Sequence, residues 1–127
     1  MYKGYTGDKE DKQAIFDFIV EKARKQNAIS MNRSNTCKYR GPNGLMCFVG
    51  FLIPDDKYEQ WMDQSSPKCK LINVLEVIGL KDHLSFLSSL QEIHDFSMNV
   101  CVWNHEFKKF AEQHNLIYTE DTDAKSI

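Results

Sequence analysis

The sequence has no long apolar run, no leader-like segment and no excess of positive charge. Its longest apolar stretch, residues 45–53, is about half of the ~20 residues that a helix needs to cross a bilayer, so we expect no membrane contact. The first residues lack the apolar core of a signal peptide, which favours a cytoplasmic location. With 16 Lys and Arg against 18 Asp and Glu, the net charge is −2, and this argues against a general attraction to nucleic acid.

The four cysteines (Cys37, Cys47, Cys69 and Cys101) include no closely spaced pair of the kind that binds structural zinc, so we predict no metal site. In a cytoplasmic chain we expect reduced thiols, although the redox state of Cys37 and Cys47 stays open. The sequence also has no Walker A loop, dinucleotide fingerprint, H-E-x-x-H, EF-hand or G-x-S-x-G motif. It therefore predicts no catalytic residue and no cofactor.

What the sequence does contain is typical of one globular domain, with 42% apolar and 27% charged residues. Apolar residues recur at helical spacing in the segments 8–27, 66–79, 82–95 and 99–114, which predicts a helix in each. A shorter helix is expected at residues 56–62. We predict a mainly α fold, a compact bundle of four to five helices with a small β-hairpin, with an α+β arrangement as the alternative. Residues 1–118 would form the domain and residues 119–127 a flexible acidic tail.

The hairpin is predicted around the turn sequence Gly-Pro-Asn-Gly at residues 41–44. Residues 37–40 and 45–47 would pair on either side of it and bring Cys37 close to Cys47. Arg40 lies at the mouth of this turn, where its guanidinium and the backbone N–H groups could hold a phosphate or carboxylate. The alternative is that Arg40 pairs with Asp55 or Asp56 and fastens the turn down.

Positive charge is concentrated before Gly44, although the chain as a whole is slightly acidic. The basic residues of this region are Lys22, Arg24, Lys25, Arg33, Lys38 and Arg40. Such a local basic face suits an acidic or phosphate-bearing partner. The candidate contact residues are Arg40, Tyr39, Asn43 and Gly44, with Arg33 and Lys38 supplying charge.

Two pairs of residues are weaker catalytic candidates. His94-Asp95 is the dipeptide of metal-dependent phosphohydrolases, but these enzymes need a further His and Asp from other helices. The structural alternative is a histidine stabilised by the dipole of a helix C-terminus. Cys101 and His105 lie four residues apart on a predicted helix, and the apolar neighbours of Cys101 favour a buried thiol over a nucleophile.

A longer pattern contains the turn: Cys-x-Tyr-Arg-Gly-Pro-x-Gly-x-x-Cys-x-x-Gly-x-Leu-Ile-Pro-Asp-x-x-Tyr, from Cys37 to Tyr58. With the downstream leucine-rich helix that ends at Asp95, it resembles a group of small uncharacterised proteins encoded by tailed phages, prophages and some bacteria. The resemblance covers about residues 35–115, and Phe48 stands where the pattern has a small residue. It implies a helical domain and a phage accessory protein that acts in the cytoplasm of an infected host, without assigning a catalytic residue.

We therefore predict a phage-encoded binding protein rather than an enzyme, which presents residues 32–44 to a host protein. Its role would be that of an inhibitor, or of a host-takeover or anti-defence factor. One alternative is a protein that sequesters a nucleotide or another phosphate ligand through Arg40 and the Gly-Pro-Asn-Gly turn. The second is a metal-dependent hydrolase that uses His94 and Asp95. The oligomeric state and the presence of any catalytic activity stay open.

Overall fold

The computed structural model describes residues 2–30, 38–63, 70–97 and 99–119, and within them the fold is mainly helical, as predicted. The four α-helices of this part of the chain are α1 (Lys12–Gln26), α2 (Leu71–Val77), α3 (Leu84–Phe96) and α4 (Trp103–Gln113). Short 3₁₀ turns connect them: η1 (Pro42–Gly44), η2 (Gly50–Leu52), η3 (Gln60–Asp63), η5 (Lys81–His83) and η6 (Val100–Val102).

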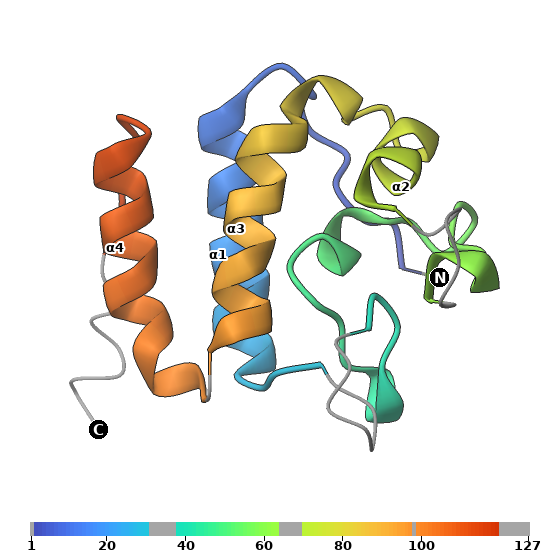
Figure 1. The fold of residues 1–127 in the computed structure, drawn as a ribbon, viewed down its shortest axis with the longest axis horizontal. Coiled ribbons are helices and arrows are strands. Elements are labelled where there is room, and N and C mark those ends of the chain that lie inside the picture. The colour runs from blue at the N-terminus through green and yellow to red at the C-terminus, as the bar shows by residue number, and fades with distance from the viewer. Residues whose placement is uncertain (1, 31–37, 64–69, 98, 120–127) are drawn as a thin grey trace.

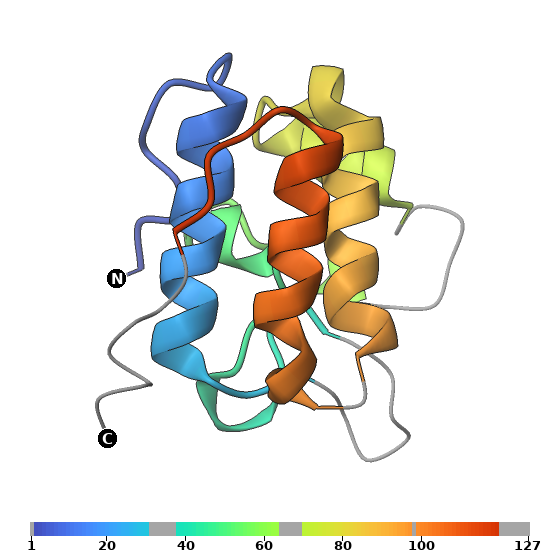
Figure 2. The same cartoon turned by 90° about the vertical axis from the view of Figure 1, so that its left-hand side faces the viewer.

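Helices α1, α3 and α4 stand side by side as a bundle (Figures 1 and 2). Helix α4 covers one side of the α1–α3 pair, and α2 lies on the other side together with the irregular segment 38–63 (Figure 1). Helix α3 contacts both α4 and α2, while α1 contacts η2. The segment that contains the predicted turn is therefore one layer of the fold.

The helix ends follow from local capping. The side chain of Asp11 accepts a hydrogen bond from the N–H of Ala14, so α1 begins at Lys12. Asn27 adopts a left-handed conformation with φ 48° and ends this helix by donating to Ala23. The predicted helix 99–114 begins with Asn99, which accepts from the N–H of Cys101 in η6 before α4 proper starts.

The core is aromatic and includes a ring from the motif. Phe48 is fully buried, and its ring centroid lies 5.1 Å from that of Trp103 and 5.4 Å from that of Phe107 on α4. Phe16 of α1 stacks on Phe110 of α4 with ring centroids 5.6 Å apart. Burying rings of this size contributes strongly to stability, so Phe48 ties the irregular layer to the bundle.

The prediction of a small β-hairpin is wrong, because the described residues contain no strand. The N–H of Gly41 donates to Leu45 O over 2.7 Å and the N–H of Cys47 to Lys38 O over 3.2 Å, so the two limbs do approach each other. However, the N–H groups of Tyr39 and Arg40 donate to the carboxylate of Asp63. The Tyr39 N–H, which a β-ladder in register with the Gly41–Leu45 bond would use, is thus taken by a side chain from elsewhere.

Other sequence-based expectations were met in part. The segment 56–62 forms only the short η3, and the segment 66–79 forms α2, whose predicted start at residues 66–67 lies outside the described residues. Of the predicted tail 119–127, only Thr119 is described. Among the described residues, none of the helices is long and apolar enough to span a bilayer.

Candidate functional site

The Arg40 side chain is directed into the protein rather than toward a ligand. Its Nη1 donates to Gly50 O over 3.0 Å, and its Nη2 donates to Ile53 O over 2.7 Å and to Asp55 Oδ1 over 3.1 Å. Only 18% of the side chain is exposed. The planar fork of the guanidinium suits this set of acceptors, and it makes Arg40 a brace between the turn and η2.

Two tyrosine rings flank the same guanidinium. The Arg40 Cζ lies 5.0 Å from the ring centroid of Tyr58 and 5.8 Å from that of Tyr2. The Tyr2 hydroxyl donates to Phe51 O, and burial raises the pKa of Tyr2 to about 12. The backbone N–H of Tyr2 donates to Asp55, and this hydrogen bond, helped by Arg40, lowers the pKa of the Asp55 carboxyl.

Asp63 is the second brace of this layer. Its carboxylate accepts from the backbone N–H of Tyr39 over 2.8 Å, from the N–H of Arg40 over 3.1 Å and from the Tyr58 hydroxyl over 2.6 Å. Burial and the bond to Asp63 raise the pKa of Tyr58. Neither Asp63 nor Tyr2 is predictable from the sequence as a site residue, because neither belongs to the spaced pattern.

The motif glycine Gly50 permits a close backbone approach. A Cβ at this position would lie 2.6 Å from Tyr39 O and 3.0 Å from Tyr39 Cα. Contacts this short do not occur in unstrained packing, so a side chain at position 50 would push the two segments apart. Together with Arg40 and Tyr58, this glycine shows that conspicuous parts of the pattern serve the fold.

Residues 42–44 form an exposed tip on this braced layer. Pro42, Asn43 and Gly44 are all exposed. Asn43 and Gly44 have φ of 60° and 75°, a left-handed conformation that these two residue types tolerate. A Cβ at Gly44 would meet no atom within 4 Å, which places this residue in open space.

The described basic residues near the turn have partners within the protein. Arg33 lies outside the described residues. Tyr39 is half-buried, and Lys38 directs its Nζ to Asp63 O over 2.8 Å. The basic residues of α1 also have partners: Lys22 lies over the Phe18 and Tyr2 rings, Arg24 donates to Tyr118 and Thr119, and Lys25 pairs with Glu21.

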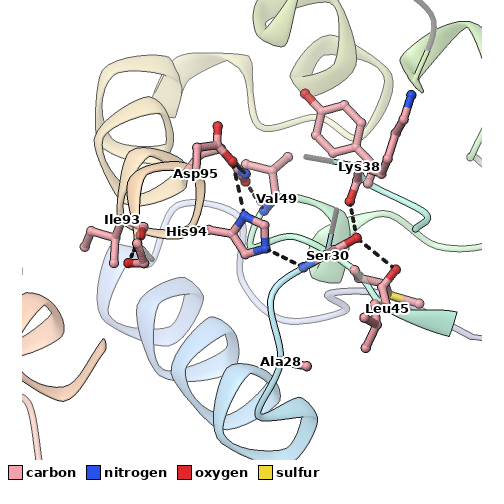
Figure 3. A network of polar contacts seen from close by, with 12 residues as sticks. Ala28, Ser30, Lys38, Leu45, Val49, Ile93, His94 and Asp95 are labelled. Atoms are coloured by element: carbon pink, nitrogen blue, oxygen red, sulfur yellow. Dashed lines mark hydrogen bonds and ion pairs between the residues drawn. The ribbon is translucent and has the colours of Figure 1, made fainter. Parts of the chain in front are cut away.

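His94 and Asp95 belong to one polar network, in which His94 is buried and Asp95 lies at the surface (Figure 3). His94 is fully buried; its Nε2 lies 3.0 Å from the backbone N of Ser30 and its Nδ1 lies 3.1 Å from Asp95 Oδ1. Both ring nitrogens therefore have protein partners. Among the described residues, no group of three or more His, Cys, Asp or Glu is arranged to hold a metal ion.

The described cysteines differ in their surroundings. Cys47 is buried, and burial raises the pKa of its thiol, so it behaves as a core residue. Cys101 is exposed in η6, which corrects the expectation that its apolar neighbours would bury it. Val100 packs partly buried against the core, whereas Cys101 and Val102 face outward on this 3₁₀ turn. The proposed approach of Cys37 to Cys47 lies outside the described residues.

A second surface feature is a groove of about 640 Å³ between α3 and α4. Ile93, Phe96, Val102 and Phe110 supply its apolar lining, and Phe96 is 80% exposed. Glu92, Glu106 and Lys109 supply charge of both signs. This groove is an alternative contact surface, well separated in sequence from the turn.

No protein-family model, curated protein or solved structure matches this chain. The candidate site is thus defined by its own geometry: an exposed three-residue tip held by Arg40 and Asp63. Neither brace directs a free polar group at a common point where a substrate could react. The arrangement is a short exposed turn whose preceding residues are fixed by side-chain hydrogen bonds.

Proposed function

We propose that this protein is a non-enzymatic binding protein that presents the turn Pro42–Gly44 to a partner protein. The observation that carries the proposal is the contrast between the buried braces and the exposed tip. Arg40 and Asp63 fasten the residues before the turn, the Gly41 N–H donates to Leu45 O across its base, and the tip residues face solvent. A loop that is already ordered loses little conformational entropy on binding, which favours affinity from a small contact area.

This proposal changes the roles of the predicted contact residues. Arg40 becomes a positioning residue, because its guanidinium is occupied by Gly50, Ile53 and Asp55. Asn43 becomes the principal contact, since its side chain is at the exposed tip. The resemblance to phage-encoded proteins supports a host protein as the partner and the host cytoplasm as the place of action.

The test is quantitative affinity purification from a bacterial host with substitutions that leave the fold intact. Asn43→Gly removes the side chain and keeps the left-handed backbone accessible, and Asn43→Asp adds a negative charge at nearly the same size. Glu112→Ala, at an exposed position on α4, is the matched control. We expect the captured partner to be lost with both Asn43 variants and retained with the control.

Phe96→Ser separates the turn from the groove between α3 and α4. The proposal expects this variant to retain the partner. Loss of the partner with Phe96→Ser, combined with full retention by Asn43→Gly, would assign binding to the groove and overturn the proposal. Circular dichroism of every variant establishes that each one is folded before its capture is compared.

A further inference from the structure

The protonation state of His94 follows from its hydrogen bonds. The backbone N–H of Ser30 can only donate, so His94 Nε2 must accept with its lone pair over 3.0 Å. The ring proton of the neutral form is then on Nδ1, which faces Asp95 Oδ1 at 3.1 Å. Gln91 fixes this carboxylate, because its Nε2 donates to the same Oδ1 over 2.7 Å while its Oε1 accepts from the N–H of Val49.

Ser30 connects His94 to both limbs of the turn (Figure 3). Its hydroxyl lies 2.8 Å from Lys38 O and 3.3 Å from Leu45 O, and its own carbonyl accepts from the N–H of Lys38 over 3.2 Å. Ser30 is fully buried, so these bonds have no competition from water. A displacement of Ser30 therefore breaks its hydrogen bonds to Lys38 and Leu45, which lie on either side of the exposed tip.

A second proton on the ring would go to Nε2, the atom that accepts from Ser30. Two N–H groups would then face each other, and the hydrogen bond would be replaced by a repulsive contact in a buried site. A conformation in which Ser30 has moved away would relieve this contact and bind the proton more tightly. Lower pH must shift the population toward that conformation, by linkage between the two equilibria.

We propose that His94 is a proton-operated latch on the turn: uptake of a second proton breaks its bond to Ser30 and loosens the limbs at Lys38 and Leu45. The regulation of partner binding rests on the proposed function of the turn. The latch itself is a property of the isolated protein and does not depend on a partner.

The groups that face His94 are compatible with this latch. Asp95, on the same helix, places its carboxylate oxygen beside Nδ1. From the other packed elements, Phe48 and Trp103 present rings at centroid distances of 5.2 and 6.3 Å. The neighbouring Cys47 thiol has its pKa raised by burial, so it stays neutral where histidine titrates. The ammonium of Lys38 is bonded to Asp63 O.

The test is nuclear magnetic resonance of the whole chain from about pH 8 to about pH 5, where histidine ordinarily changes charge. We expect the amide resonances of Ser30 and Lys38 to change with the same midpoint as the His94 ring, while those of Ile19 in α1 stay in place. His94→Gln supplies an amide oxygen that can accept from Ser30 and cannot titrate. In this variant the Ser30 and Lys38 amides should be insensitive to pH.

A further variant makes the result specific. His105→Gln removes an exposed histidine of α4 and should leave the Ser30 change as it is. The proposal is overturned if the Ser30 amide does not change over this pH range, if its change persists in His94→Gln, or if every amide changes together as in global unfolding.

The same samples distinguish the latch from the function of the turn. A pH-dependent Ser30 change in the wild type, together with a partner that Asn43→Gly still captures, supports the latch and contradicts the proposed function. Loss of the partner in Asn43→Gly without any Ser30 change supports the proposed function and overturns the latch.

Discussion

Replacing Arg40 by Lys keeps the positive charge and removes the planar fork, so it tests whether the guanidinium is a brace. Arg40 donates to two buried carbonyl groups, Gly50 O at 3.0 Å and Ile53 O at 2.7 Å. A buried acceptor that loses its donor costs about 1–3 kcal/mol. A lysine ammonium reaches one of these carbonyls at best, which gives an expected loss of about 2 kcal/mol for Arg40→Lys and about 4 kcal/mol for Arg40→Ala.

The assay is urea unfolding followed by circular dichroism, with the change in midpoint converted through the slope of the transition. Lys25→Ala is the control, because Lys25 makes only an exposed ion pair with Glu21 on α1, and it should change the free energy of unfolding by less than about 0.5 kcal/mol. If Arg40→Lys is as stable as this control, the guanidinium does not brace the turn and the reasoning is refuted.

Three further predictions concern the same layer. Gly50→Ala should destabilise by about 2–3 kcal/mol in urea unfolding, because its Cβ would lie 2.6 Å from Tyr39 O, whereas Gly44→Ala should cost about 1 kcal/mol through its positive φ alone. Asp63→Asn should lower the free energy of unfolding by about 2 kcal/mol, because an amide has one acceptor oxygen whereas the two carboxylate oxygens accept from three donors. An Asp63→Asn variant as stable as the wild type would contradict this prediction. Burial raises the pKa of Tyr2 to about 12, so its neutral form stabilises the fold below about pH 10, and this contribution is lost as the pH rises to about 12. Tyr2→Phe should lose less stability over this alkaline range than the wild type. If the free energy of unfolding depends on pH in the same way in both proteins, ionisation of Tyr2 is not the cause of the loss.

The helices were predictable because their signals are local. Asp11 and Asn27 lie next to the apolar pattern of α1, and each makes the capping bond that its residue type favours. The alternative in which Arg40 pairs with Asp55 is confirmed by a distance of 3.1 Å between Nη2 and Oδ1. Short-range patterns thus gave the helical class and one partner of the key arginine.

The hairpin was not predictable in the same way, because a long-range bond decides the structure. Asp63 follows Arg40 by 23 residues and accepts from the N–H of Tyr39, which a β-ladder beside the turn would need. Nothing in the spacing distinguishes Asp63 from Asp55 or Asp56. The roles of Ser30 and His94 were hidden for the same reason, since 64 residues separate them.

Site-specific photo-crosslinking tests the central claim most directly, namely that the braced turn is the surface that meets a partner. A photoreactive amino acid at position 43, at the exposed tip, is compared with the same group at position 112 on α4 and at position 96 in the groove. The account predicts one discrete protein adduct from position 43 and none from the other two. An adduct from position 96 with none from position 43 would contradict it.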